Sequence, residues 1–285
     1  MLGIRLASNR AVSTRNSKTH WPALELLASQ RLLVIGHRGY CELAPENTLP
    51  SFELALASGV DLVELDYRYS KDGMPVVIHD TALDRTTNAI QRWGKKNHRV
   101  ASKTIAELRS LDAGIWFAPW FAGTKIPLLT EALDLICRNS VALIEHKAGS
   151  AADCLKLLRE KRLINRVVVQ SFDWEFLRLL HEREPRQVLA ALGPPAVLSH
   201  GKKPWGISRK LNAAWLHQMQ KTGARVAVWN RQVSRRAVQL AHERKWKVWV
   251  YTINETRLAR RLRQAGVDGI ITNNPRLIGE MYRTT

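Results

Sequence analysis

A regular alternation of short apolar runs with amphipathic segments is the feature that most constrains how this chain folds. From Trp21 onward, each run typical of a buried β-strand is followed by a segment with apolar residues at helical spacing. Such alternation indicates βα units and a parallel sheet. The expected strands span residues 32–35, 62–67, 141–145, 167–171, 188–192, 225–229, 248–253 and 269–272.

The segments between these runs are the expected helices. Gly59, Gly223 and Gly266 stand where such helices end, because glycine readily adopts the left-handed backbone of a C-terminal cap. Eight strands that alternate with helices predict an α/β fold of the (β/α)8 TIM-barrel type, with its active site at the carboxyl ends of the strands. The expected helices span residues 49–57, 131–138, 152–161, 174–184, 213–221, 235–245, 255–264 and 275–282.

The alternation is interrupted between residues 67 and 126. These residues, about 60 in all, are too many for an ordinary βα loop. They contain the turn signal Asp72-Gly73, a strand-like run at 76–79 and an aromatic segment at 116–121. We therefore expect a barrel domain over residues 21–285, with a small insertion subdomain at about 67–126, after the second strand and over the barrel mouth.

The first 20 residues are basic and contain no acid, and we expect them to form a disordered tail. Their Arg, Ser and Thr content also fits an organelle-targeting peptide, which is the alternative. No apolar run approaches the roughly 20 residues that span a bilayer. Cys41, Cys137 and Cys154 form no Cys-x-x-Cys pair, which argues against a disulfide framework or zinc finger and favours a reducing, cytoplasmic location.

The chain carries a formal net charge of +19, and the excess is uneven. Between Lys202 and Lys247 the only acid is Glu243. A positive field of this kind attracts nucleic acids, anionic lipid surfaces and phosphate esters, but it does not specify a fold.

Three acids lie on two neighbouring barrel strands. Glu64 and Asp66 are two residues apart, so they face the same way on a strand, and Glu145 ends the next expected barrel strand. Three oxygen donors that converge on one point suit a hard cation, Mg2+ or Ca2+ with Mn2+ as a third candidate, better than zinc. The alternative is that each acid pairs with a nearby base, Arg38 or Lys147.

His37 and His79 are the candidate proton-transfer groups, because imidazole titrates near neutral pH. His37 follows the first strand, and His79 ends the strand-like run of the insertion. Lys147 lies two positions after Glu145 and faces the same way, so Lys147 and Arg38 form a cationic clamp for phosphate oxygens. His146 points away from this site by strand alternation, and we expect it to be structural.

Further polar residues belong to the same end of the barrel. Asn47 or Thr48 can cap the helix at 49–57, whereas Glu46 would lie at the mouth beside His37, where it supports the metal or orients the imidazole. Gln170 ends the fourth expected strand and therefore lies at the same rim.

These residues resemble the glycerophosphodiester phosphodiesterase family, from about Leu32 to Pro275. The most specific matches lie near the amino terminus. The matching segments are Gly36-His37-Arg38-Gly39, Pro45-Glu46-Asn47-Thr48, Glu64-Leu65-Asp66, Asp72-Gly73, Val77-Ile78-His79-Asp80, Arg85-Thr86-Thr87, Ile126-Pro127, Ile144-Glu145-His146-Lys147, Gln170-Ser171-Phe172 and Gly266-Val267-Asp268-Gly269-Ile270-Ile271-Thr272.

The resemblance implies a phosphoric diester hydrolase of lipid and glycerol metabolism. Its substrates would be glycerophosphodiesters, and its products sn-glycerol 3-phosphate and an alcohol such as choline, ethanolamine or glycerol. The three acids would hold one divalent cation, the two histidines would act as acid and base, and Arg38 and Lys147 would bind the phosphate. Direct attack by water and attack by the substrate's own hydroxyl, which gives a cyclic phosphate, both remain open.

Three positions depart from the pattern of the family. Tyr251 stands where tryptophan is commoner, Asn273 where aspartate is typical, and His146 where an apolar or other residue is usual. None of them is an expected metal ligand or acid/base histidine. They therefore bear on substrate fit more than on catalysis.

Two other functions compete with this one. A lysophospholipase D activity on lysophospholipids would use the aromatic insertion and the basic half to reach anionic membrane surfaces, with which the chain would associate weakly. A polyanion-binding barrel would use the stretch from Lys202 to Lys247 and its tryptophans. Nucleic-acid binding is the less favoured of the two, because a charge run is usually a solvated face. The tryptophans concerned are Trp205, Trp215, Trp229 and Trp246.

Overall fold

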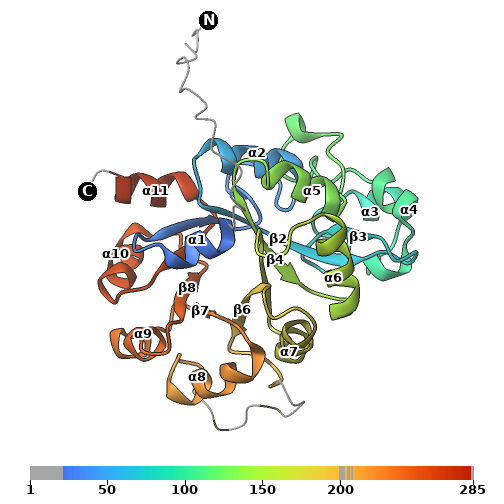
Figure 1. Cartoon of the computed structure of the whole chain (residues 1–285). Coiled ribbons are helices and arrows are strands. Elements are labelled where there is room, and N and C mark those ends of the chain that lie inside the picture. The colour runs from blue at the N-terminus through green and yellow to red at the C-terminus, as the bar shows by residue number, and fades with distance from the viewer. Residues whose placement is uncertain (1–21, 199–202, 204–205, 207, 284–285) are drawn as a thin grey trace, which may run out of the picture.

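The computed structural model describes residues 22–198, 203, 206 and 208–283, so the expected basic tail, residues 1–20, lies outside the described part. Eight parallel strands close into a barrel, because β1 pairs with β9 on one side and with β2 on the other (Figure 1). The predicted (β/α)8 barrel is confirmed. Its strands are β1 Leu33–Gly36, β2 Leu62–Tyr69, β4 Val141–His146, β5 Val168–Ser171, β6 Val188–Gly193, β7 Val226–Asn230, β8 Lys247–Tyr251 and β9 Gly269–Thr272.

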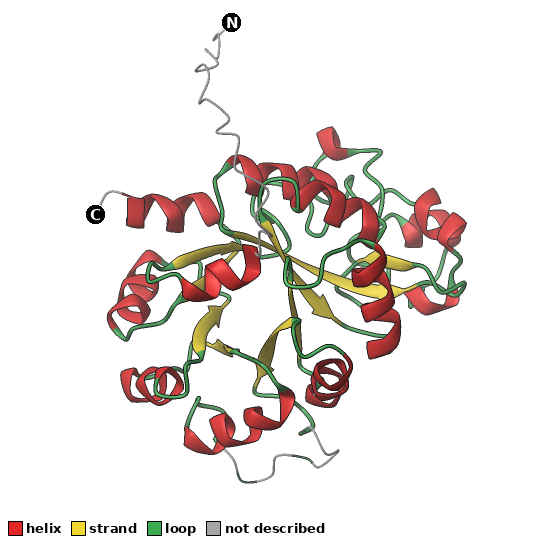
Figure 2. Ribbon diagram, in the orientation of Figure 1, coloured by secondary structure: helices red, strands yellow, loops and turns green. Residues whose placement is uncertain are grey.

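Helices surround the barrel and cover its outer face (Figure 2). Gly59, Gly223 and Gly266 have positive φ angles of 74°, 69° and 93°, as expected of caps. One helix, α9, ends three residues before the predicted boundary, because the backbone turns left-handed at Lys245 with a φ of 60°. The ring consists of α2 Leu49–Ala57, α5 Leu129–Ile136, α6 Ala151–Glu160, α7 Trp174–Arg183, α8 Ala213–Met219 with the 3-10 turn η3 Gln220–Thr222, α9 Arg235–His242, α10 Thr256–Gln264 and α11 Pro275–Arg283.

The amino end of the barrel is closed by a helix that the sequence pattern did not indicate, α1 Pro22–Ala28. Its residue Ala23 belongs to the buried cluster inside the barrel, together with the first residues of several strands. Leu24, Leu26 and Leu27 pack against the same cluster. Because these contacts are made at strand beginnings, α1 seals the end opposite to the strand carboxyl ends. The strand residues concerned are Leu33, Leu62, Val141, Val168, Val188 and Val226.

The insertion after β2 has a hydrophobic core of its own, separate from the barrel cores. Val76, Leu83 and Leu108 are fully buried in it. The strand β3 Pro75–Val77 pairs antiparallel with β2 outside the barrel, so His79 lies beyond the strand and not at its end as predicted. The other elements are α3 Ala89–Trp93, η1 Val100–Ser102, α4 Ile105–Ser110 and η2 Pro119–Phe121.

Membrane-spanning helices and disulfides are both absent from the part of the chain that the structure describes. No helix there is long and apolar enough to cross a bilayer. Cys41, Cys137 and Cys154 are all free.

Candidate active site

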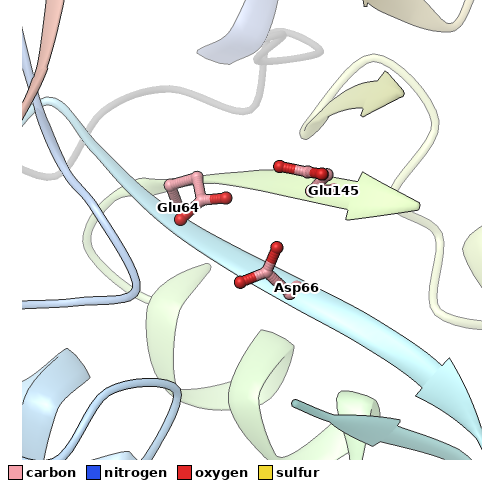
Figure 3. Close-up of side chains that lie close together, drawn as sticks. All are labelled: Glu64, Asp66 and Glu145. Carbon is pink, nitrogen blue, oxygen red and sulfur yellow. The ribbon is translucent and has the colours of Figure 1, made fainter. Parts of the chain in front are cut away.

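Three carboxylates meet at the carboxyl end of two paired barrel strands. Glu64 and Asp66 project from β2, and Glu145 projects from β4 toward them (Figure 3). Strand pairing places Asp66 directly beside Glu145. One oxygen of each side chain lies within 4.8 Å of the corresponding oxygens of the other two, and all three residues are buried. The sequence prediction that these acids converge is therefore met by the geometry.

Neighbouring polar groups fix the carboxylates of β2. The backbone N–H of Arg38 donates to Glu64 Oε2 at 2.8 Å, and Gln170 Nε2 donates to Glu64 Oε1 at 3.3 Å. Asn47 Nδ2 donates to Asp66 Oδ2 at 2.8 Å, while Asn47 Oδ1 accepts from the Asp66 backbone N–H at 3.1 Å. Such bonds orient ligand oxygens before any cation binds.

The acid cluster fits a hard divalent cation. Burial and the repulsion between the acids raise the pKa of Glu64 well above its usual value and raise the pKa of Glu145 to about 7. Burial would also raise the pKa of Asp66, but Lys147 and Arg38 together lower it. Asp66 Oδ1 and Glu145 Oε1 are buried, and the Lys147 ammonium forms ion pairs with both. A cation between these oxygens would relieve the repulsion and complete their coordination.

The loop after β1 carries His37 and Arg38 over the acids in a left-handed turn. Arg38 has a φ of 51° and Asn47 a φ of 59°, both unusual for residues with a Cβ. The turn is held by its backbone, since Asn47 N–H donates to the Arg38 carbonyl at 3.1 Å and His37 N–H donates to the Thr272 carbonyl at 2.8 Å. Burial, with Arg38 beside it, lowers the pKa of His37 to about 4, and its Nδ1 lies 2.7 Å from Asn273 Oδ1.

His79 reaches the site from the insertion and is oriented by its neighbour Asp80. His79 Nδ1 lies 2.7 Å from Asp80 Oδ1, and burial lowers the pKa of His79. Arg85 Nε donates to the other carboxylate oxygen of Asp80 at 2.7 Å. Arg85 also donates to both carboxylate oxygens of Glu46, which in turn accepts a bond from Arg38 Nη1 at 2.7 Å. Residues of alternating charge, Arg38, Glu46, Arg85 and Asp80, thus connect the loop after β1 to the segment that carries His79.

The predicted clamp and both histidines line one pocket of about 200 Å3 at the barrel mouth. Its polar lining consists of the histidines, Glu64, Glu145, Gln170, Thr252 and the two cations, Arg38 and Lys147. The remaining lining residues are largely apolar: Phe172, Leu192, Tyr251 and Ile271.

A pocket with buried acids, paired cations and two oriented imidazoles has the groups needed to bind and cleave a phosphate ester. Residues 37–277 match the model of the glycerophosphoryl diester phosphodiesterase family. The chain belongs to this family. The glycerophosphodiester phosphodiesterase of Caldanaerobacter subterraneus subsp. tengcongensis is 31% identical over 260 residues, which cover 89% of this chain and 98% of that protein.

Solved structures are similar over the same extent. A putative glycerophosphoryl diester phosphodiesterase from Silicibacter pomeroyi superposes with a TM-score of 0.76 at 29% identity, over 91% of this chain and 98% of that one. An Oleispira antarctica phosphodiesterase, in complex with the product sn-glycerol-3-phosphate, has a TM-score of 0.75 at 26% identity, over 89% of this chain and 98% of that one. This chain is accordingly a phosphodiesterase, which is an enzyme of the hydrolase class.

Two of the sequence expectations for this phosphodiesterase need correction. Asn47 does not cap α2, because its amide binds Asp66, and Thr48 occupies the cap position without a side-chain bond to the helix. Glu46 is bound by Arg38 and Arg85, and among the described residues no hydrogen bond joins it to an imidazole or to the acid cluster. His146 faces away from the pocket, as predicted, with its ring stacked on Phe176 at 3.5 Å between centroids.

Three residues that hold the histidines of the phosphodiesterase are not among the predicted site residues: Asp80, Arg85 and Asn273. Asp80 and Arg85 stood in matching segments, and Asn273 was noted only as a departure from the family. The carboxylate directly after His79 is a usable signal in the sequence, because a catalytic histidine usually has a hydrogen-bond partner that orients its ring. The separation of 236 residues between His37 and Asn273 left no local signal.

Proposed function

We propose that this phosphodiesterase hydrolyses glycerophosphodiesters to sn-glycerol 3-phosphate and an alcohol, with a divalent cation and the two histidines as the catalytic groups. The observation that carries the proposal is the convergence of the cationic pair, both imidazoles and two acids of the cluster, Glu64 and Glu145, on one pocket at the barrel mouth. The glycerol phosphate complex of the Oleispira antarctica phosphodiesterase supports the substrate class.

The cationic pair binds the phosphate in this proposal. Arg38 and Lys147 both line the pocket, and each is anchored through Asp66, at 3.4 Å and 3.2 Å respectively. Glu64, Asp66 and Glu145 would hold the cation, which supplies Lewis-acid polarisation of a phosphate oxygen when bound. Because the carboxylates are held by Asn47 and Gln170, their oxygens need little reorganisation.

The histidines move the protons. Each ring has its Nδ1 engaged, His37 with Asn273 and His79 with Asp80, which leaves the Nε2 atoms for proton exchange with the reacting oxygens. One imidazole accepts the proton of the attacking hydroxyl and the other protonates the departing alcohol oxygen. Burial lowers both pKa values, which favours the neutral form that the base needs, so the histidine that acts as the acid must take up a proton before the alcohol departs.

The test is a substrate panel. Glycerophosphocholine, glycerophosphoethanolamine, glycerophosphoglycerol and a lysophosphatidylcholine are each incubated with Mg2+, Ca2+, Mn2+ or a chelator, and sn-glycerol 3-phosphate and free alcohol are measured. We expect turnover of the glycerophosphodiesters with one preferred metal and none with the chelator. Faster turnover of the lysophospholipid would favour the lysophospholipase D alternative instead. Full activity in the chelator would contradict the metal, and no turnover of any diester would contradict the proposed function.

A further inference from the structure

The segment that carries His79 has little regular structure to hold the ring in place. His79 and Asp80 follow the end of β3 and form a bend. Its backbone is tied at three points: the Ile78 N–H donates to the Asp66 carbonyl at 3.0 Å, Arg68 Nε donates to the His79 carbonyl at 2.8 Å, and the Thr81 carbonyl accepts from the Val100 N–H at 3.0 Å. These bonds hold the backbone but do not set the rotation of the imidazole, and the side chain that contacts its Nδ1 is Asp80.

Arg85 uses three nitrogens to connect two loops. Its Nε binds Asp80 Oδ2, and its two Nη atoms bind the two oxygens of Glu46, each at 2.7 Å. Glu46 belongs to the loop after β1, whereas Asp80 and Arg85 belong to the insertion. The guanidinium therefore ties the segment of His79 to the loop of Arg38. Only a planar fork of donors makes bonds in these two directions at once.

We propose that Arg85 is a positioning residue of the reaction, which fixes His79 through Asp80 and Arg38 through Glu46. The proposal rests on the proposed function, in which His79 and Arg38 act on the phosphate. Arg85 itself does not line the pocket. Its side chain is 46% exposed, so its ion pairs contribute little to global stability, and its loss should act on the chemistry more than on folding.

Two substitutions of Arg85 separate geometry from charge. Arg85→Ala removes both, while Arg85→Lys keeps the charge and loses the fork. We expect kcat to fall on the order of 100-fold in both variants, because small displacements of catalytic groups are costly. Arg109→Ala is the matched control, since Arg109 also joins the insertion to the barrel, through Glu131 at 2.6 Å, and is 36% exposed. The control should keep kcat close to that of the unmodified enzyme.

A double variant tests the route of the effect. If Arg85 acts through Asp80, the Asp80→Ala, Arg85→Ala pair should lose no more than about tenfold beyond Asp80→Ala alone, because residues of one network are not additive. Melting temperatures of all variants are measured alongside. Arg85→Lys with full kcat, or equal losses in Arg85→Ala and Arg109→Ala, would overturn the proposal. An unmodified enzyme without turnover on the substrate panel would instead contradict the proposed function.

A second inference comes from an exposed basic surface at α10 and the residue after β7. Arg231, Arg257, Arg260 and Arg261 line one shallow groove on α10 and the loop before α9. All four side chains are exposed, and within the described part of the chain none forms an ion pair. Glu255 is the acid that lines the same groove. We name these four arginines the arginine surface.

The expected tryptophans do not accompany this surface. Trp215 and Trp229 are 1% and 0% exposed, and Trp246 packs against the main core. Trp205 lies outside the described residues. Single-stranded nucleic acids bind basic grooves largely by stacking their bases on exposed aromatic rings. The described members of this set are therefore not arranged for that partner.

We infer that the arginine surface docks the enzyme on anionic phospholipid membranes. Unpaired arginines on an exposed helix face are attracted to anionic head groups. The inference rests in part on the proposed function, because a glycerophosphodiester is a phospholipid without its acyl chains and arises where phospholipids are deacylated.

Vesicle sedimentation tests the docking. The full chain is mixed at low salt with vesicles of phosphatidylcholine alone or of phosphatidylcholine with phosphatidylserine. We expect binding to the anionic vesicles only, lost at high salt and reduced at least about tenfold in Arg257→Gln, Arg260→Gln, Arg261→Gln. Turnover of soluble glycerophosphocholine should not change in this triple variant, which keeps the two proposals separate.

The matched control removes the same charge elsewhere. Arg178→Gln, Arg186→Gln, Arg276→Gln neutralises three arginines that are each paired with a glutamate. This variant should bind anionic vesicles like the unmodified chain. Equal losses of vesicle binding in the two triple variants would mean that net charge alone causes the attraction. Unchanged binding in the arginine-surface variant would mean that another segment binds the vesicles. Either result would overturn the inference. Binding to single-stranded RNA with no binding to vesicles would also overturn the inference.

Discussion

Nδ1 of His37 lies 2.7 Å from Oδ1 of Asn273, a contact that joins the loop after the first barrel strand to the residue after the last. The amide oxygen only accepts, so Nδ1 carries the hydrogen and Nε2 keeps its lone pair. We expect Asn273→Ala to lower kcat about tenfold or more, because the ring loses its orientation. Asn273→Asp retains an acceptor and should keep more activity. Steady-state kinetics on a glycerophosphodiester compare the two, and an unimpaired Asn273→Ala enzyme would contradict the role.

The low pKa of His37 makes stability depend on pH. Burial lowers this pKa from 6.5 to about 4, so the unfolded chain takes up the proton at higher pH than the folded one. The free energy of unfolding should therefore fall as the pH falls from 6.5 toward 4. We expect His37→Gln to remove up to roughly 3 kcal/mol of this decrease. Urea unfolding across this range measures it, with exposed His217→Gln as the control. An unaltered pH dependence in His37→Gln would refute the assignment.

We expect the charge of Glu145 to lower the stability of the folded enzyme in the absence of a cation. Its pKa of about 7 means that the folded state disfavours its charge, so stability decreases as the pH rises from 4.5 through 7. Above that range and in a chelator, we expect Glu145→Gln to melt a few degrees higher, on the order of one or two kcal/mol more stable. Adding the preferred cation should raise the melting temperature of the unmodified enzyme only. A variant that is less stable in the chelator would contradict the repulsion described above.

The two imidazoles and the acid cluster should be indispensable. We expect His37→Ala, His79→Ala and Glu64→Ala each to lower alcohol release on the order of 1,000-fold or more, because general acid–base and metal catalysis contribute factors of this size. Circular dichroism and the melting temperature establish that the variants are folded. Undiminished turnover in any one of them would remove that residue from the mechanism.

Gly39 is required by the turn that presents His37 and Arg38. Its φ is 88°, and an added Cβ would lie 2.3 Å from Ser51 Oγ and 2.7 Å from the Ser51 carbonyl. Gly123 has the same φ of 88° with nothing within 4 Å of such a Cβ. We expect Gly39→Ala to destabilise by at least about 2 kcal/mol and Gly123→Ala by about 1, because only the first adds a clash to the backbone strain. Chemical unfolding of both variants tests whether the difference exists.

The barrel was predictable because its strands are buried on both sides and read as unbroken apolar runs. The acid cluster was predictable for a related reason, since the alternation of side chains and the carboxyl-end rule place Glu64, Asp66 and Glu145 together. The helix α1 was missed because its contacts are with the barrel interior and not with a neighbouring strand of the repeat.

The contacts that support the site were harder to predict from the sequence. Asn47 stood at a helix start, where a cap is the ordinary role, but the carboxylate of Asp66 competes for its amide from another strand. The end of β3 was misplaced because the apolar run continues through Ile78, whose side chain packs into the core of the insertion after the strand has ended. Contacts of this kind depend on how segments meet in space.

The position of α1 makes the two ends of the barrel unequal. Its residues pack against the cluster at the strand beginnings, while the pocket opens at the carboxyl ends of the strands. Substrate and product therefore share one entrance. An inhibitor bound at that mouth should consequently block both the entry of the diester and the release of the products.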